Sequence, residues 1–243
     1  MWNKHQRKLP AWGATCRMLS IASALVLSAS VLTAKEETVA ERLTDATEVF
    51  SDVMKMPDKS IPMDLLNRAE CVVIVPALKS GAFLVGAKYG KGFISCRRRS
   101  GTGWSAPGAV RIEGGSFGLQ IGGSESDVVM LVMNDQGVKA VLSSQYTLGG
   151  QLAVAAGPVG RSSSAQTSGW MNAGILSYSR SRGVFAGVSL EGATLRQDTD
   201  DNQSLYGRPL NNEEIVLSGR TRVPAAATKL IAELRRYSPR ERK

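Results

Sequence analysis

The sequence predicts an α+β fold: a single domain with a curved, mainly antiparallel β core, flanked by N-terminal and C-terminal helices. Apolar residues recur at helical spacing over residues 38–56 and again after Pro224. Between these segments, short β-branched runs alternate with turn residues from Cys71 to Leu195. Glycine is dense over residues 81–192, where it permits the bulges and bends of a strongly curved sheet.

The N-terminus has the pattern of a secretory signal. Four bases come first, Lys4, Arg7, Lys8 and Arg17. The uncharged run Met18–Leu32 follows, and it is shorter than the roughly 20 residues of a membrane span. Residues 1–34 are therefore predicted to be a signal peptide cleaved between Ser30 and Ala34, with an uncleaved signal anchor as the alternative. The protein is expected to be exported, either periplasmic or secreted, with peripheral membrane association as a further option.

Residues 38–56 form the first predicted helix. Its apolar stripe consists of Val39, Leu43, Ala46, Phe50 and Val53. Pro57 and Pro62 end this helix, and a short helix is expected from Pro62 to Ala69. The polar side of the first helix is acidic and opposes an anionic membrane. We therefore expect its apolar stripe to pack against the β core rather than enter lipid.

The middle of the chain is predicted to be a series of strands. They cover residues 71–76, 83–90, 92–97, 104–112, 116–121 and 127–133, with Gly90 and Gly92 as a turn between two of them. A short helix is favoured at 138–144, and residues 174–180 and 184–190 predict a hairpin. Residues 198–204 are expected to be a polar loop, a second amphipathic helix begins at Pro224, and residues 238–243 are predicted to be a disordered tail.

Charge and cysteine content bound the class of partner. Removal of residues 1–34, which hold four bases and no acids, lowers the net charge from +9 to +5. Residues 220–243 alone carry eight bases and two acids. A basic chain favours anionic partners, and export favours membrane phosphates or anionic glycans over nucleic acid. Cys71 and Cys96 remain after processing; they form either a disulfide, which an oxidising compartment permits, or two buried thiols.

The absence of histidine excludes several catalytic classes. The one histidine, His5, lies in the predicted signal, so the processed chain has no Ser-His-Asp triad, no Cys-His dyad and no histidine-bound metal. We expect no cofactor. A carboxylate-dependent hydrolase stays open as an alternative. Its candidate acids are Glu113, Glu125, Asp127, Asp135 and Glu191, and turn residues or ion-pair partners are the simpler interpretation of all five.

Six stretches in order resemble the SYLF family. They are residues 69–76 (AECVVIVP), 86–92 (GAKYGKG), 104–107 (WSAP), 114–134, 155–161 (AAGPVGR) and 175–195 (ILSYSRSRGVFAGVSLEGATL). The resemblance covers about residues 40–237, so residues 35–237 are assigned to one SYLF-type domain. It implies an α+β fold and non-catalytic binding of phospholipid, phosphoinositides in eukaryotic members and anionic lipids in bacterial ones. Some eukaryotic members bind actin, a partner not expected for an exported bacterial protein.

The candidate lipid-binding residues are bases at predicted strand ends and turns, with two amphipathic aromatics. They are Lys88, Lys91, Arg97, Arg98, Arg99, Arg161, Arg180 and Arg182, together with Tyr89 and Trp104. Arginine and lysine suit phosphate oxygens, and tyrosine and tryptophan suit a membrane interface. The alternatives are scattered surface bases and buried aromatics. Alternation places Arg180 on the inward face with Tyr178, so an ion pair, for example with Glu191, is its expected role. An envelope scaffold that binds protein rather than lipid is the second functional hypothesis.

Overall fold

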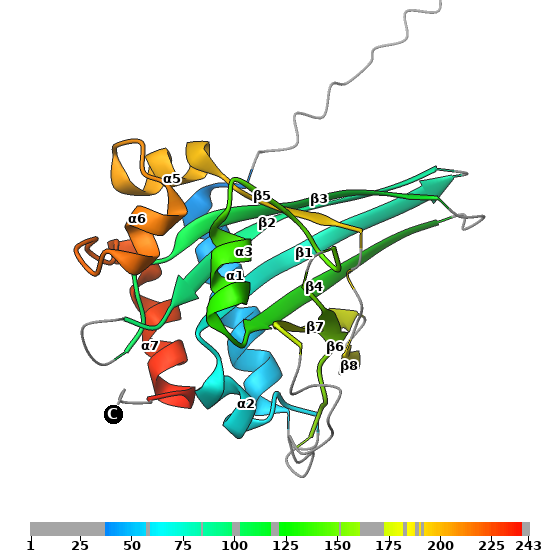
Figure 1. Cartoon of the computed structure of the whole chain (residues 1–243), viewed down its shortest axis with the longest axis horizontal. Helices are drawn as coiled ribbons and strands as arrows, with labels where there is room; N and C mark the ends of the chain where they lie inside the picture. The colour runs from blue at the N-terminus through cyan, green and yellow to red at the C-terminus, as the bar shows by residue number, and fades with distance from the viewer. Residues whose placement is uncertain are drawn as a thin grey trace, which may run out of the picture. The chain divides into compact units, whose positions relative to one another are not determined.

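The fold is built on one curled sheet whose strands are mainly antiparallel (Figure 1). The computed structural model describes residues 37–56, 59–83, 85–98, 103–117, 122–150, 152–160, 173–181, 184–187, 190 and 192–239. The strands are β1 (Cys71–Phe83), β2 (Val85–Cys96), β3 (Gly108–Phe117), β4 (Gly122–Val132), β5 (Gln145–Thr147), β6 (Val154–Ala156), β7 (Ile175–Ser181), β8 (Val184–Gly187) and β9 (Thr194–Gln197). Their order is β5-β9-β3-β2-β1-β4-β7-β6, with β8 also paired to β7, and only β6 and β7 run parallel.

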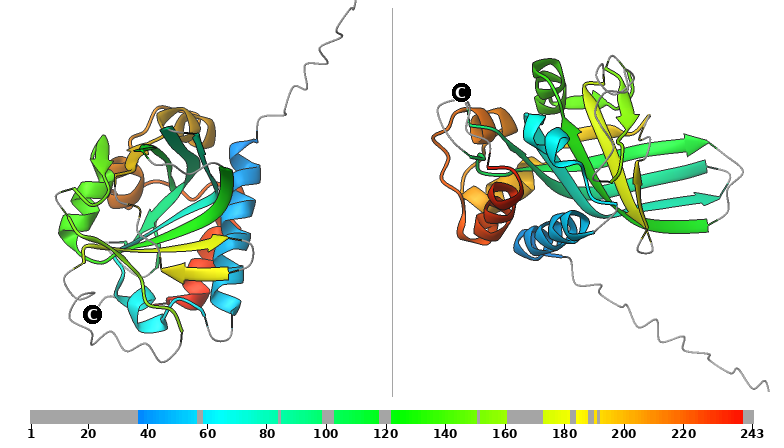
Figure 2. Two further views of the ribbon diagram at one scale, coloured as in Figure 1. Left: turned by 90° about the vertical axis from the view of Figure 1, so that its right-hand side faces the viewer. Right: turned by 90° about the horizontal axis from the view of Figure 1, so that it is seen from below.

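The two outer strands of this order, β5 and β6, are close neighbours in the chain. A short connection therefore spans from one edge of the sheet to the other, which requires the sheet to curl (Figure 2). The Tyr146 hydroxyl on β5 donates to the Leu152 carbonyl, 3.2 Å away, and Ile175 N donates to the Ala153 carbonyl. The predicted curved α+β core is confirmed.

Helices cover both faces of the sheet. They are α1 (Val39–Lys55), α2 (Met63–Arg68), α3 (Asp135–Leu142), α5 (Thr199–Tyr206), α6 (Asn212–Leu217), the 3-10 turn η1 (Ala225–Ala227) and α7 (Thr228–Tyr237). A capping box between Thr38 and Glu41 starts α1 close to where the sequence predicts. Among the described residues, no helix has both the length and the apolar content that spanning a bilayer requires.

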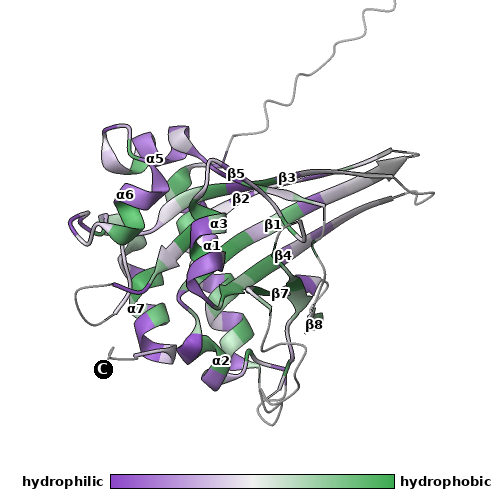
Figure 3. Ribbon diagram, in the orientation of Figure 1, coloured by the Kyte–Doolittle hydropathy of each residue, from purple (hydrophilic) through white to green (hydrophobic). Residues whose placement is uncertain are grey.

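Strand alternation sorts the apolar residues into two cores. On β1, Val72 and Ile74 face the layer formed by α1, α2 and α7, whereas Val73 and Val75 face α3 and α6. Figure 3 shows the resulting apolar bands at the covered part of the sheet and polar residues on the outer sides of the helices. The prediction that the 38–56 helix packs against the β core is confirmed, because its Leu43, Phe50 and Val53 are buried there. We call the α1 side the convex face and the α3 side the concave face.

The predicted turn at Gly90 and Gly92 is wrong. Both glycines lie inside β2, which runs unbroken from Val85 to Cys96. A Cβ added at Gly92 would lie 2.1 Å from the Ile74 carbonyl oxygen of β1. The register of β1 shifts between Ile74 and Lys79, so these glycines make room for a bulge in the neighbouring strand.

Two expectations for the C-terminal part also need correction. The expected polar loop at 198–204 is the helix α5, which Asp198 caps by accepting from Asp201 N. Its Asn202 is fully buried, accepting from Ala109 N and donating to the Leu210 carbonyl. Ser238, predicted as the start of a disordered tail, is also fully buried. Polar residues can occupy a core when every donor and acceptor is satisfied, which composition does not reveal.

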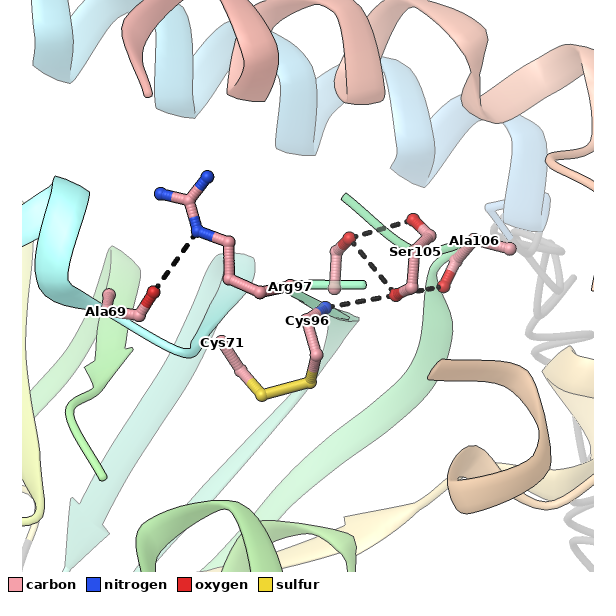
Figure 4. Close-up of a disulfide and its surroundings, with 7 residues drawn as sticks. Ala69, Cys71, Cys96, Arg97, Ser105 and Ala106 are labelled. Atoms are coloured by element: carbon pink, nitrogen blue, oxygen red, sulfur yellow. Dashed lines mark hydrogen bonds between the residues drawn. A yellow bond between two sulfur atoms is a disulfide. The ribbon is translucent and has the colours of Figure 1, made fainter. Parts of the chain in front are cut away.

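Cys71 and Cys96 form a disulfide between β1 and β2. Figure 4 shows the disulfide on one side of the sheet and the Arg97 side chain on the other, toward the helices of the convex face. The Ser105 hydroxyl accepts from Cys96 N at 3.0 Å and supports this end of β2. Of the two alternatives left open by the sequence, the structure contains the disulfide.

Candidate functional site

The candidate lipid-binding residues do not gather into one site. Arg99, Arg161 and Arg182 lie outside the described residues. The remaining seven fall into three groups. Arg97 and Trp104 are buried, Lys91 and Arg180 are ion-paired, and Lys88, Tyr89 and Arg98 reach the surface.

Arg97 and Trp104 form a buried socket for the residue that follows α7. The Arg97 guanidinium lies 3.9 Å from the centre of the Trp104 ring and donates to the Ser238 carbonyl at 2.8 Å and to the Leu66 carbonyl at 3.3 Å. It also bonds the Ser238 hydroxyl, and Trp104 Nε1 donates to the Ser238 carbonyl. The socket therefore ties β2, α2 and the end of α7 together. Arg97 and Trp104, which the sequence placed among the surface candidates, belong to the interior.

Lys91 is neutralised by two acids of the α5 segment. Its ammonium lies 3.1 Å from Asp198 Oδ2 and 3.2 Å from Asp201 Oδ1. Arg42 of α1 also binds Asp201, so the cluster joins α1, β2 and α5. Burial lowers the pKa of Lys91, but the hydrogen bonds and charges of the two carboxylates outweigh burial and raise the pKa above its ordinary value.

Arg180 has the structural ion pair that its position predicted, although with other partners. It binds Asp127 of β4 at 2.8 Å and Asp52 of α1 at 2.9 Å, and Glu191 lies outside the described residues. Burial lowers the pKa of Arg180, and the bonds to Asp52 and Asp127 outweigh burial and raise it. Asp127 also accepts from Ala77 N in the β1 bulge, where Ala77 has a φ of 48°. The network therefore stabilises the left-handed backbone conformation of Ala77 beneath α1.

We call Arg98 and two arginines of α7, Arg235 and Arg236, the basic corner. Arg98 N donates to the Gly103 carbonyl, and Arg235 lies over Gly103. Arg98 Nε donates to the Trp104 carbonyl at 3.1 Å. A Cβ added at Gly103, whose φ is 88°, would lie 3.1 Å from Arg235 Nε, so Arg235 covers the same connection. Arg236 lies 3.6 Å from Glu233 and 5.4 Å from the centre of the Tyr237 ring. Neither Arg98 nor Arg235 has an ion-pair partner within the part of the chain that the structure describes.

Sequence reasoning missed Arg235 and Arg236 as site residues. The available signal was the excess of bases over residues 220–243. The loop from α6 to α7, which carries the exposed Arg220 and Arg222, lies at the same end of the molecule (Figure 1). This end therefore concentrates the positive charge that the acidic α5 segment does not neutralise.

Lys88 and Tyr89 lie on β2, which ends one residue before Arg97, so they are about 30 Å from Arg97 at 3.3 Å per residue. Their side chains point to opposite faces of β2, and Tyr89 is 48% exposed. The structure thus separates them from the basic corner.

The candidate acids of the hydrolase alternative are held by bases or exposed on the surface. Glu113 binds Arg111 and Arg196, and Asp127 binds Arg180. A hollow of about 580 Å³ beside α3 and β5 has no carboxylate in its lining. A groove of about 280 Å³ between α1 and α7 is lined by Glu48, Asp52 and Glu233, with Lys55 and Lys229 among them. Glu191 lies outside the described residues, and the other four predicted acids are not among the described residues that line either hollow.

Comparison with known proteins identifies the family. Residues 113–237 match the family model Ysc84, described as "Las17-binding protein actin regulator". The chain belongs to this Ysc84, or SYLF, family, and the resemblance read from the sequence is confirmed. It is 38% identical over 178 residues to "Protein YSC84" of Saccharomyces cerevisiae, covering 72% of this chain and 37% of that protein. It is 37% identical over 202 residues to human "SH3 domain-containing YSC84-like protein 1", covering 83% of this chain and 58% of that protein.

The matched proteins are longer than this chain. A Schizosaccharomyces pombe "SH3 domain-containing protein" is 41% identical over 175 residues, which cover 70% of this chain and 40% of that protein. This Ysc84-family chain thus spans well under two thirds of the curated relatives it matches. The family description names Las17 binding and actin regulation for the proteins that it covers.

Proposed function

We propose that this Ysc84-family domain is an exported, non-catalytic bacterial protein that binds anionic phospholipid surfaces by electrostatic attraction. The observation that carries the proposal is the basic corner. Arg98 and Arg235 have no carboxylate partner among the described residues, whereas Lys91 and Arg180 each have two. Guanidinium groups bind phosphate oxygens in a bidentate manner, and each base near an anionic membrane contributes about 1 kcal/mol.

Export is supported by two observations of different kinds. The N-terminal residues have the charge and apolar pattern of a secretory signal. The disulfide between Cys71 and Cys96 is typical of oxidising compartments and rare in the cytosol. Fractionation of cells that produce the full-length chain tests this part of the proposal. Recovery of the shortened chain outside the cytoplasm is expected, and recovery of an intact chain in the cytoplasm would contradict it.

Sedimentation with vesicles tests lipid binding directly. Residues 35–243 are mixed with phosphatidylcholine vesicles that contain or lack phosphatidylglycerol, at 50 and 200 mM salt. We expect binding to the anionic vesicles that weakens as salt rises. Replacing both Arg98 and Arg235 by Gln removes about 2 kcal/mol, so binding is expected to fall about 30-fold.

A matched control keeps the total charge change equal. Lys59 and Lys139 are exposed, lie away from the basic corner in sequence and on other elements, and can be replaced together by Gln. This double variant is expected to retain most of the binding. An equal loss in both double variants would mean that net charge matters and the basic corner does not. Equal binding to neutral vesicles would contradict the electrostatic mechanism.

A second candidate is a protein-interaction scaffold of the cell envelope. It is favoured by the description of the Ysc84 family, which names Las17 binding and actin regulation for the proteins that it covers. This candidate predicts no sedimentation with either vesicle and recovery of a specific partner after cross-linking in cells. The vesicle experiment therefore distinguishes the two candidates.

A further inference from the structure

The side of the sheet that carries α3 has a hollow of about 580 Å³ at the β5 edge. Helix α3 and strand β5 lie side by side there (Figure 1). The volume is within the range of about 300–1,000 Å³ that is typical of small-molecule sites. The described residues of its lining carry amide and hydroxyl groups, one lysine and no carboxylate. No residue of the basic corner is among them, so the hollow is a separate candidate site.

Helix α3 turns a polar side toward the hollow. Gln136 and Lys139 line it, and their spacing of three residues places them on the same side of the helix. Gly137 and Val141, on another side of α3, are buried. A Cβ added at Gly137 would lie 2.8 Å from the Gly174 carbonyl oxygen, so α3 packs closely against the backbone just before β7. This contact fixes the position of the polar side of α3 beside β5.

Strand β5 brings two backbone donors to the hollow. It is the outermost strand of the sheet order and pairs with β9 alone among the described strands. Leu148 N donates to the Ala193 carbonyl at 2.8 Å, so Leu148 and, two residues earlier, Tyr146 direct their backbone groups toward β9. The backbone groups of Gln145 and Thr147 therefore point to the free edge. Both residues line the hollow, and their N–H groups can donate to a ligand there.

The carbonyl groups at this edge already accept hydrogen bonds from within the domain. Three such bonds are made, to Gln145 from Ser143 Oγ at 3.0 Å, to Thr147 from Gly150 N at 3.1 Å and to Leu152 from the Tyr146 hydroxyl at 3.2 Å. The edge thus offers more unused donors than unused acceptors. An added β-strand would need both kinds of group in alternation, whereas an oxyanion only accepts. The backbone therefore favours an oxyanion as the ligand.

Lys139 adds a positive charge to these donors. Its side chain is exposed, and it forms no ion pair with an acid of the described residues, including Asp135 one turn earlier. The described lining of the hollow holds no carboxylate that would compensate this charge. The charge of Lys139 therefore favours the same class of ligand as the N–H groups of β5.

Two hydroxyl groups complete the wall. Ser143 Oγ donates to the Ala140 carbonyl at 2.7 Å and the Tyr146 hydroxyl donates to the Leu152 carbonyl, so both hydroxyl oxygens are left to accept from a ligand. Ala140 and Leu152 add apolar surface to the lining. A matching ligand has an anionic group, hydroxyl donors and a face of carbon and hydrogen.

We propose that this hollow binds an acidic sugar, with the carboxylate on Lys139 and on the N–H groups of Gln145 and Thr147, and with sugar hydroxyls on Ser143 and Tyr146. A sugar acid carries an oxyanion, hydroxyl donors and an apolar ring face in one small molecule. The headgroup of an anionic lipid shares the first two features, but a membrane surface attracts groups of bases, and the described lining has one. The inference goes beyond the proposed lipid binding, because it assigns a second class of ligand to a different site.

Titration followed by nuclear magnetic resonance tests the site. Residues 35–243 are isotope-labelled, and the amide signals of Gln145 and Thr147 report directly on the two proposed backbone bonds. The probes are D-glucuronate, D-glucose and glycerol 3-phosphate, each titrated into the low millimolar range. We expect D-glucuronate to shift both signals in a saturable manner. D-glucose lacks the carboxylate and is expected to bind at least about tenfold more weakly.

Substitutions with matched controls test the role of charge. Lys139→Gln is expected to raise the Kd for D-glucuronate about tenfold, which corresponds to the loss of one charge-assisted hydrogen bond. Lys59→Gln changes the net charge equally at another exposed lysine and is expected to leave the Kd unchanged. Gln136→Glu places a carboxylate in the wall and should weaken binding at least as much, whereas Gln203→Glu on α5 should not. All four positions are exposed, and the dispersion of the amide signals checks folding.

The outcomes decide the inference independently of lipid binding. Equal shifts with D-glucose and D-glucuronate would show that the charge of Lys139 is not used, and would overturn the proposal. Tighter binding of glycerol 3-phosphate at the same amides would assign the hollow to a lipid headgroup, which overturns the sugar. Unchanged signals with D-glucuronate would overturn the site altogether. Vesicle sedimentation depends on Arg98 and Arg235, so it stands or fails whichever of these results is found.

Discussion

The buried socket and the basic corner use neighbouring arginines for opposite purposes. Arg97 is 8% exposed and makes hydrogen bonds to Ser238, Leu66 and Ala69. Arg98, the next residue, makes one hydrogen bond to a backbone carbonyl and stays half-exposed. Alternation along the end of β2 turns one side chain under α7 and the other toward solvent. A cluster of bases in a sequence is therefore not yet a positively charged surface.

The same contrast holds between Lys91 and Lys88. Lys91 is held between Asp198 and Asp201, whereas Lys88, three residues earlier on β2, has no carboxylate partner among the described residues. A base with a carboxylate partner at 3 Å contributes little to the long-range attraction of an anionic surface. The predictions below test this division between bases that stabilise the fold and bases that remain available for binding.

The largest effect is expected from Arg97→Ala. The change removes the Arg97 donor from the buried Ala69 carbonyl and one of two donors from each of the Ser238 and Leu66 carbonyls, and it removes the stacking on Trp104, at a cost of about 3 kcal/mol in the free energy of unfolding. Arg98→Ala is the control and is expected to cost about 1 kcal/mol or less. Urea denaturation with the disulfide intact measures both. Equal losses would show that the two arginines are not divided as described.

A smaller loss is expected from Lys91→Met. It removes the nearer of the two bases beside Asp198, whose side chain is 2% exposed and which keeps Arg111 at 4.0 Å, and it is expected to cost about 2 kcal/mol of unfolding free energy. Vesicle binding by the folded variant should be unchanged. Lys88→Met should show the reverse, with stability unchanged and weaker binding. The division fails if Lys91→Met lowers binding more than Lys88→Met does.

The smallest effect concerns Tyr178, whose buried hydroxyl has no hydrogen-bond partner among the described residues. Tyr178→Phe is expected to change the unfolding free energy at pH 7 by less than about 0.5 kcal/mol, because no bond is lost. Tyr206→Phe is the control. The Tyr206 hydroxyl donates to the Pro107 carbonyl at 2.6 Å, so its removal is expected to cost about 1 kcal/mol.

Stability measurements at alkaline pH give a second test of Tyr178→Phe and Tyr206→Phe. Burial raises the pKa of Tyr178 and of Tyr206 well above the ordinary value of about 10. Between the unfolded and folded pKa values the folded state binds more protons, so stability is unaffected below about pH 10 and falls as pH rises above it. The Phe variants should each lose less stability than the unmodified chain between pH 8 and pH 11. An unchanged alkaline loss in Tyr178→Phe would mean that this phenol ionises freely in the folded protein.

Local sequence patterns predicted the helices and strands in which buried residues recur at a regular spacing. The bounds of α1 and of the β7–β8 hairpin were predicted within a few residues. The start of β1 at Cys71 was also predicted, although β1 continues to Phe83, beyond its predicted end at Pro76. The failures have one cause. Gly90 and Gly92 mark close approach to the β1 bulge rather than a turn, and the polar residues of α5 are buried because Ala109 and Leu210 satisfy Asn202. Each outcome depends on a distant segment that no local window contains.

The sequence by itself determined the family and the α+β class. Only the tertiary structure decided which bases are neutralised, because their partners are remote in the chain. Lys91 and Asp201 are separated by 110 positions, Arg180 and Asp52 by 128, and Arg97 and Ser238 by 141. Hydrogen bonds and ion pairs require the two atoms to lie about 3 Å apart. The folded sheet and its helices bring such atoms together, and the composition of the chain does not show which ones meet.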